Sequence, residues 1–174
     1  MLRIALQSKG RLNEESMALL HEAGIKLEWG KRLLLVPAKN FPIEVLFLRD
    51  DDIPQTVADG VADIGIVGEN EFAEKDKKVN IAKRLGFSKC RLSLAIPKSA
   101  EYVDLSWFNG KVIATSYPGI LEKYLKENNI SADIHVITGS VEIATGIGLA
   151  DAIFDIVSSG STLLTNQLKE VEVV

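Results

Sequence analysis

Short apolar runs alternate with amphipathic stretches along the whole chain. The apolar runs are rich in Ile, Val and Leu, and this composition is typical of buried strands. They predict strands at 2–6, 31–36, 43–48, 62–67, 81–85, 92–96, 111–115, 134–136, 152–157 and 171–174. The stretches between them predict helices that begin at 12 or 13 and end near 23, and helices at 51–59, 69–74, 119–128, 141–149 and 162–169.

Strands that alternate with helices predict an α/β fold with mostly parallel sheets. The alternation restarts at Cys90, so two series of elements meet near residues 87–91. We therefore expect a first lobe over 1–89 and a second lobe over 90–166, with a cleft between them. Ligands of open α/β sheets bind at the carboxyl ends of strands, so the loops that follow strands are the candidate sites.

Composition and charge narrow the class of protein. Hydrophobic residues make up 47% of the chain and charged residues 25%, as in globular proteins. The net charge of −4 argues against general nucleic-acid binding. Cys90 is the only cysteine, which excludes an intrachain disulfide and fits a reducing cytoplasm. The sequence shows neither a signal peptide nor an apolar run of membrane-spanning length, so we expect a cytoplasmic protein without membrane contact.

Two charged loops follow strands of the first lobe. Residues 9–11 (Lys-Gly-Arg) precede a helix, and a phosphate site and a solvated loop explain them equally well. The three acids at 50–52 could bind Mg²⁺, but capping of the next helix is the favoured interpretation. Arg49 either pairs with one of these acids or faces the cleft.

Three further loops combine small and polar residues. The turn at 68–70 (Gly-Glu-Asn) is explained by a strand-to-helix connection alone. The hydroxyls at 115–117 (Thr-Ser-Tyr) could hold a phosphate or a sugar, and could equally cap the helix after Pro118. Ser140 is typical of a helix N-cap, and Glu142 then lies in the first helical turn.

The sequence DIVSSGSTL at 155–163 is the strongest candidate. Amides around Gly160 could form an anion-binding nest, and the hydroxyls of Ser159, Ser161 and Thr162 could add donors. An acid just upstream, Asp155, could accept hydrogen bonds from ribose hydroxyls. This arrangement outlines a 5-phosphoribosyl site and differs from a Walker loop, because no Lys follows the glycine. A hydroxyl-rich helix cap explains the loop almost as well.

No constellation for nucleophilic catalysis is visible. His21 lies in a predicted helix and His135 in a predicted strand, and neither pattern supports a triad. The lone Cys90 has no metal-ligand spacing around it, so zinc is not expected.

Longer segments closely resemble the ATP phosphoribosyltransferase family, the first enzyme of histidine biosynthesis. They cover nearly the whole chain in order: LRIALQSKGRL, RDDDIPQTVADGVADIGIVGEN, CRLSLAIP, NGKVIATSYP, GSVEIATGIGLADAIFDIVSSGSTL and LKEVEV. The resemblance implies two α/β lobes like those of type II periplasmic binding proteins, with the active site in the interlobe cleft. It also implies that ATP condenses with 5-phosphoribosyl 1-pyrophosphate (PRPP) to N1-(5-phosphoribosyl)-ATP and pyrophosphate, with Mg²⁺ as cofactor.

The resemblance also assigns roles to residues. The candidate catalytic cations are Lys9, Arg11 and Arg49. The candidate PRPP-binding residues are Glu142, Asp151, Asp155, Ser158, Ser159, Gly160, Ser161, Thr162 and Leu163. The candidate ATP-binding residues are Gly10, Asp50, Gly68, Glu69, Asn70, Thr115, Ser116 and Tyr117. Adenine N1 has a free lone pair, so the reaction needs positioning and charge stabilisation rather than a strong base.

The family pattern extends beyond Val174. By the resemblance, residues 167–174 return to the first lobe, which would then be incomplete, and we expect a chain truncated at its C-terminus. Histidine would act as feedback inhibitor only with the regulatory domain that follows in the family. We expect ATP and PRPP as partners and a homo-oligomer, dimer or higher. The alternative to an enzyme is a non-catalytic module of the same fold that binds a small anion or a nucleotide.

Overall fold

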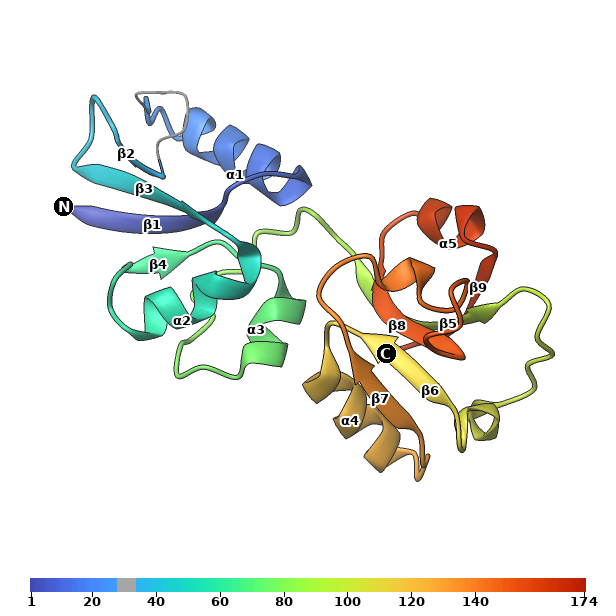
Figure 1. Ribbon diagram of the computed structural model, residues 1–174. Helices are drawn as coiled ribbons and strands as arrows, with labels where there is room; N and C mark the ends of the chain where they lie inside the picture. Colours follow the sequence, from blue (N-terminus) through green and yellow to red (C-terminus); the bar gives the residue numbers. More distant parts are fainter. Residues whose placement is uncertain (28–33) are drawn as a thin grey trace. The chain divides into compact units, whose positions relative to one another are not determined.

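The chain forms two compact units, each built on its own sheet (Figure 1). The computed structural model describes residues 1–27 and 34–174. Unit 1 is Met1–Ser88 and unit 2 is Lys89–Val174. The predicted boundary at 89/90 therefore lies one residue from the observed one.

The sheet of unit 1 has the strand order β2-β3-β1-β4. Its strands are β1 (Leu2–Gln7), β2 (Leu35–Pro37), β3 (Ile43–Leu48) and β4 (Ile64–Gly65). The helices are α1 (Arg11–Glu22), the 3-10 turn η1 (Asp50–Asp52), α2 (Ile53–Ala58) and α3 (Glu69–Lys75). Because β3 and β4 both run parallel to β1, the loops after these three strands lie at the same edge of the sheet.

Helices cover both faces of this sheet (Figure 1). Ile4 and Leu6 of β1 pack with Leu20 of α1 on one face. Ala5, between them in sequence, packs with Ile53 of α2 on the other. This alternation follows the two-residue period of a strand and explains why residues 4–6 of β1 are all apolar.

The sheet of unit 2 has the strand order β7-β6-β8-β5-β9. Its strands are β5 (Arg91–Pro97), β6 (Val112–Thr115), β7 (Asp133–Val136), β8 (Ala152–Val157) and β9 (Leu168–Val173). The helical elements are η2 (Leu105–Phe108), α4 (Pro118–Glu127), η3 (Val141–Ile143) and α5 (Ser161–Thr165). Strands β6, β7 and β8 are parallel, β5 runs antiparallel to β8, and β9 runs antiparallel to β5.

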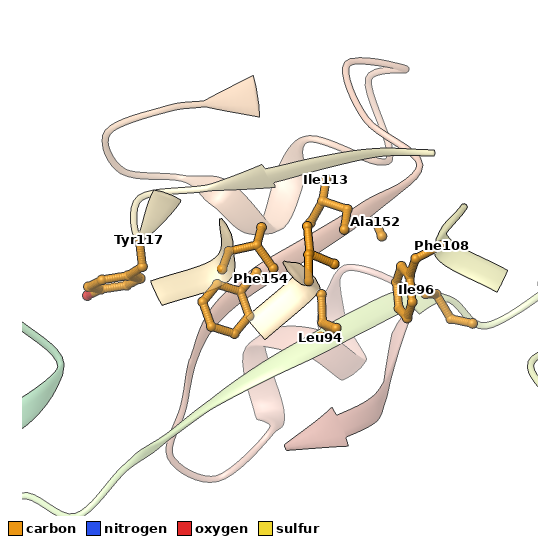
Figure 2. Close-up of a cluster of buried hydrophobic side chains, with 9 residues drawn as sticks. Leu94, Ile96, Phe108, Ile113, Tyr117, Ala152 and Phe154 are labelled. Atoms are coloured by element: carbon orange, nitrogen blue, oxygen red, sulfur yellow. The ribbon is translucent and has the colours of Figure 1, made fainter. Parts of the chain in front are cut away.

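The larger core of unit 2 lies between its sheet and α4. Figure 2 shows the side chains of Leu94, Ile113 and Phe154, which come from three neighbouring strands, gathered in one cluster. Leu121 and Leu125 of α4 close this cluster, and both are fully or almost fully buried. The alternate strand residues, such as Ala114 and Ile153, face a second cluster on the other side of the sheet. Both faces of this sheet are therefore covered as well.

Four predictions about the elements are wrong. No strand forms at 81–85, where Ile81 and Leu85 are exposed. The helix predicted at 141–149 is only the single turn η3, and the helix predicted at 162–169 ends at Thr165. The β4 strand is two residues long rather than the predicted 62–67.

The segment 167–174 belongs to unit 2, and its predicted return to the first lobe is wrong. Strand β9 pairs with β5 along most of its length, and Leu168 is completely buried in the core of unit 2. The prediction of a strand at 31–36 lies partly outside the described residues, and β2 covers its last part. Within 1–27 and 34–174, no helix has the length and apolar character to cross a membrane.

Candidate functional site

The predicted phosphate loop lies at the edge of the unit 2 sheet where the parallel strands end. The chain leaves β8 at Val157, passes through Ser158, Ser159 and Gly160, and enters α5 at Ser161. The loop after β7, which leads into η3, reaches the same edge because β6 pairs in parallel with both β7 and β8. This placement brings Glu142 of η3 toward the end of β8.

These loops enclose a small polar pocket of about 50 Å³. The pocket is lined by the carboxyl-bearing residues and most of the hydroxyl-rich loop: Glu142, Asp155, Ile156, Val157, Ser158, Ser159, Gly160, Thr162 and Leu163. Seven of the predicted PRPP-binding residues thus line one pocket, although they come from two separate stretches of sequence. Ser161 is next to them, with its Oγ 3.0 Å from Ser159 Oγ.

The loop backbone has amide donors next to Gly160 that are unpaired within the described residues, and open space around this residue. Gly160 has φ +81°, and an added Cβ would meet no protein atom within 4 Å. Among the described residues, no group accepts a hydrogen bond from the amides of Ser159 or Gly160. Helix α5 has only five residues, so its macrodipole contributes less than the predicted longer helix would. Free amides and hydroxyl groups around a glycine suit an anion.

Asp155 is the most perturbed carboxyl of the site. Its pKa is raised to about 6: desolvation by burial is the largest cause, the hydrogen bond donated by the Ile156 amide opposes the shift, and the nearby charge of Glu142 adds to it. A carboxylate desolvated in this way is stabilised by any ligand that donates hydrogen bonds or brings positive charge. The perturbation supports a functional interpretation of Asp155 because it coincides with a lined pocket.

Asp151 does not join this site, which corrects its predicted grouping with Asp155. It lies just before β8 starts, and four residues of extended chain span about 13 Å. Its Oδ2 accepts a hydrogen bond of 2.9 Å from the Val112 amide, which fixes the start of β6 against β8. Asp151 therefore has a structural role at the opposite edge of the sheet.

The predicted ATP-binding hydroxyls at 115–117 have partners inside unit 2. Thr115 Oγ1 accepts a hydrogen bond from the Tyr117 amide at 2.8 Å, and Ser116 Oγ donates to the Ile137 carbonyl at 2.6 Å. The Tyr117 side chain is part of the hydrophobic cluster in Figure 2 and is 5% exposed. These contacts organise the turn that leads into α4, but the N-cap residue of that helix, Tyr117, makes no side-chain capping bond.

The remaining candidates lie in three loops at one edge of the unit 1 sheet, after β1, β3 and β4. The first loop is fixed by the Ser8 amide, which donates to the Leu48 carbonyl at 2.7 Å. Gly10 has φ +94° and precedes α1. Lys9 is exposed and forms no ion pair with the residues of 1–27 or 34–174, whereas Arg11 is 3.7 Å from Glu15.

The charged residues of the second loop contact one another. Arg49 is exposed and pairs with Asp51, with Nε 3.1 Å from Oδ1, and this pairing raises the pKa of the Arg49 guanidinium. Asp50 Oδ1 accepts a hydrogen bond from the Asp51 amide in the first turn of the 3-10 segment. One acid, Asp50, therefore holds an amide of the turn before α2, whereas Asp52 at the N-cap of α2 makes no side-chain capping bond, and Arg49 is paired with Asp51.

The third loop brings the Asn70 side chain close to its glycine. A Cβ at Gly68 would lie 2.3 Å from the Asn70 side-chain oxygen, so a larger residue would displace Asn70. Glu69 pairs with Arg84 through a 2.6 Å contact between Oε1 and Nε. The loop is thus organised by internal contacts, and the structure adds no ligand-specific feature to the predicted role of Gly68, Glu69 and Asn70.

The described residues include no group of three or more His, Cys, Asp or Glu side chains that could hold a metal ion. Mg²⁺, however, commonly binds through one or two carboxylates together with substrate phosphates. The neighbouring carboxyls of Glu142 and Asp155 fit the protein's share of such a site.

Two sets of supporting residues were not predicted. Asn13 Nδ2 donates to the Gln7 carbonyl at 2.6 Å and so bridges the loop between β1 and α1. Arg91, Ser93 and Glu170 form a charged cluster beside the phosphate loop. The Asn at the third helical position was a local signal that could have been used, whereas the Arg91–Glu170 pair joins residues 79 positions apart.

We expect Asn13→Ala to loosen the 8–10 loop. The variant loses a bridging hydrogen bond, which should lower the free energy of unfolding by about 1 kcal/mol and speed amide exchange at Ser8 and Gly10. Asn128→Ala is the matched control, because Asn128 Nδ2 makes a similar 2.8 Å bond to a backbone carbonyl in unit 2. Equal exchange rates at Ser8 and Gly10 in both variants would show that Asn13 does not order the loop.

Comparison with known proteins first defines the class of fold. The probable amino-acid ABC transporter extracellular-binding protein ytmK from Bacillus subtilis superposes with a TM-score of 0.58 at 15% identity, over 99% of this chain and 79% of that chain. At this identity the likeness shows the fold alone. The chain has the two-lobed α/β fold of type II periplasmic binding proteins, as the sequence predicted.

The family is shown by closer relatives. The sequence model of the ATP phosphoribosyltransferase family (HisG) matches residues 49–174. The ATP phosphoribosyltransferase of Parabacteroides distasonis is 74% identical over the whole chain, which covers 62% of that relative. The ATP phosphoribosyl transferase (HisG:HisZ) complex from Thermotoga maritima superposes with a TM-score of 0.84 at 32% identity, over 100% of this chain and 83% of that chain. The chain belongs to the ATP phosphoribosyltransferase family.

The chain spans 62% of the length of its curated relatives from Parabacteroides distasonis and Bacteroides fragilis. The match begins at the first residue of the chain and continues to its last, so both units are covered. The predicted family membership is confirmed.

Proposed function

We propose that the chain carries the catalytic region of an ATP phosphoribosyltransferase, which joins ATP and PRPP, and that the loop 158–163 binds the 5-phosphate of PRPP. The observation that carries this proposal is the pocket in which Asp155 and Glu142 lie beside the hydroxyl-rich loop. Free amides and hydroxyls suit the phosphate, and the two carboxylates suit the ribose hydroxyls. Membership of the family supports the same assignment.

In the proposed reaction, adenine N1 of ATP attacks C1 of the ribose of PRPP. The N1–C1 bond forms as the bond from C1 to the pyrophosphate oxygen breaks, and pyrophosphate leaves with that electron pair. Because N1 already carries a lone pair, the protein's part is to hold two polyanions in register. Lys9, Arg11 and Arg49 are the cations we propose for the substrate phosphates, since guanidinium and ammonium groups stabilise phosphate charge.

Mg²⁺, when bound with the pyrophosphate group, would neutralise charge on the leaving oxygens. Glu142 and Asp155 are the side chains we propose on the protein's side, where they would also accept hydrogen bonds from the ribose hydroxyls. ATP is proposed to contact unit 1 through Gly10, Asp50 and the 68–70 turn. A cytoplasmic location, a homo-oligomer of two or more subunits and histidine inhibition through a further domain belong to the same proposal.

The test is an assay with ATP, PRPP, Mg²⁺ and a pyrophosphatase, which follows phosphoribosyl-ATP by its ultraviolet absorbance. We expect turnover from a chain extended to the full length of the relatives, and PRPP binding by the 174-residue chain itself. Turnover only by the extended chain would show that the added segment contains an element that activity requires. No turnover by either chain would refute the enzymatic proposal.

A non-catalytic binding module is the alternative. Its support is the likeness to extracellular binding proteins, which concerns the fold alone. A small anion that binds with higher affinity than PRPP would favour this alternative, and so would PRPP binding without turnover in the extended chain.

A further inference from the structure

Arg91 lies beside the phosphate loop without lining its pocket. It is the first residue of β5 and pairs with Val157, the last residue of β8. Its guanidinium binds both carboxylate oxygens of Glu170, with Nε 2.6 Å from Oε1 and Nη2 2.5 Å from Oε2. The remaining nitrogen, Nη1, donates to the Ser158 carbonyl at 3.5 Å. The side chain therefore connects strand β9 to the first residue of the loop.

Glu170 fixes the orientation of this guanidinium. Ser93 Oγ donates to Glu170 Oε1 at 2.6 Å, so the carboxylate is held from two positions on β5. Hydrogen bonds from Arg91 and Ser93 lower the pKa of Glu170, which keeps it ionised at neutral pH. A bidentate arginine–carboxylate pair has a fixed planar geometry, and this geometry leaves Nη1 directed toward Ser158.

The bond to the Ser158 carbonyl constrains the next amide. In a trans peptide the C=O and the following N–H lie in one plane and point in opposite directions. The 3.5 Å contact of Arg91 with the Ser158 carbonyl is long for a hydrogen bond, and it favours a Ser159 N–H that points away from Arg91. That amide has no acceptor among the residues that the structure describes, and Ser159 lines the pocket.

We propose that Arg91 is a positioning residue for the phosphate loop. Glu170 and Ser93 orient its guanidinium, and the guanidinium sets the Ser158–Ser159 peptide plane for the 5-phosphate of PRPP. The inference rests on the proposed function of the loop. Arg91 itself need not touch the ligand. Its effect is transmitted through the backbone carbonyl that it holds.

The experiment compares Arg91→Lys and Arg91→Ala with the unchanged 174-residue chain. Lysine keeps the positive charge beside Glu170, but a single ammonium cannot reproduce the fork that reaches Glu170 and Ser158 together. We expect Arg91→Lys to weaken PRPP binding roughly tenfold in calorimetry with Mg²⁺, and to change ATP binding less than about twofold. The amide resonances of Ser159 and Gly160 should shift, and exchange of the Ser159 amide should change, without ligand.

Tyr102→Phe is the matched control. The Tyr102 hydroxyl donates to Glu172, so this variant also loses a side-chain bond to β9, but at a position without contact to the loop. We expect unchanged PRPP affinity and unchanged Ser159 and Gly160 resonances in this variant.

The outcomes separate the two proposals. If the unchanged chain and the extended chain both bind no PRPP, the function proposed for the loop fails, and the Ser159 and Gly160 resonances decide the role of Arg91. If the unchanged chain binds PRPP and neither Arg91 variant alters its affinity or these resonances, the positioning role is refuted. Equal losses of PRPP and ATP binding, matched by Tyr102→Phe, would refute it as well, because they would indicate a general effect of β9.

Discussion

Gly160→Val should weaken PRPP binding by about 100-fold or more and should change ATP binding by less than about threefold. Gly160 lies at the centre of the proposed 5-phosphate loop with φ +81°. A valine there is strained in this backbone conformation, which favours a rearranged loop, and its methyl groups would fill the space proposed for the phosphate. Calorimetric titration with each substrate measures the two affinities.

Any loss of stability in Gly160→Val should arise in the loop rather than in the hydrophobic core. An added Cβ at Gly160 meets no protein atom within 4 Å, so no buried side chain has to move. We expect a decrease of about 1–2 kcal/mol in the free energy of unfolding, from backbone strain alone.

Gly110→Val is the control for this strain. Gly110 has φ +71° and also has no protein atom within 4 Å of an added Cβ. It precedes β6, whereas the loop follows β8, and these strands are parallel, so Gly110 lies at the opposite edge of the sheet. A similar loss of stability with unchanged PRPP affinity is expected. If both variants lost PRPP and ATP binding equally, Gly160 would have no specific role in the phosphate site.

Local sequence predicted the strands that contain several consecutive buried apolar residues. Strand β1 is a clear case, because its consecutive residues Ile4, Ala5 and Leu6 are all buried and face two different clusters. The 81–85 segment has a similar composition but forms no strand, and Ile81 is 41% exposed. Composition measures strand propensity, whereas a strand also requires a neighbour with free backbone groups, and the local sequence does not specify that neighbour.

The C-terminal segment shows the same limit. The helix predicted at 162–169 ends at Thr165, because Gln167 adopts φ +56° and the chain turns into β9. The stability of β9 comes from its pairing with β5, more than 70 residues earlier in the chain. Propensity within a short window contains no information about that partner.

In the candidate site, too, features that are contiguous in sequence were predicted and features formed by distant residues were missed. The hydroxyl-rich loop is contiguous in sequence, so its chemistry could be predicted directly from residues 155–163. The family resemblance grouped Asp151 with Asp155, yet an extended strand places them at opposite edges of the sheet. Arg91 was missed for the converse reason, since its partners are distant in sequence and meet only through strand pairing.

Asp155→Asn should lower kcat/KM for PRPP by about 100-fold and should also stabilise the protein at neutral pH. The loss follows if the carboxylate accepts hydrogen bonds from the ribose hydroxyls, because an amide is uncharged and offers only one acceptor oxygen. The gain in stability follows because the ionised Asp155 is unfavourable in the folded protein: its pKa is raised from 3.8 to about 6, mainly by desolvation. Each pKa unit corresponds to about 1.4 kcal/mol, so the ionised carboxyl costs up to about 3 kcal/mol at pH 7.

Asp151→Asn is the matched control, since it makes the same change at the other end of β8. Asp151 accepts a hydrogen bond from the Val112 amide, so a small loss of stability is expected, with kcat/KM for PRPP nearly unchanged. If Asp151→Asn lowered kcat/KM for PRPP as much as Asp155→Asn, the assignment of Asp155 to the ribose would be wrong.

The pH dependence of stability and of PRPP binding tests the role of Asp155 independently. Well below pH 3.8, Asp155 is protonated in both the folded and the unfolded chain, so its burial carries no ionic penalty. From pH 4 to 6 the unfolded chain ionises first, and the contribution of Asp155 to stability falls as pH rises. PRPP binding should change in the opposite direction, because the ionised carboxylate is the proposed acceptor and forms as pH rises through about 6. Urea unfolding and PRPP titration across this range should therefore show opposite slopes in the unchanged chain, and Asp155→Asn should remove both contributions together.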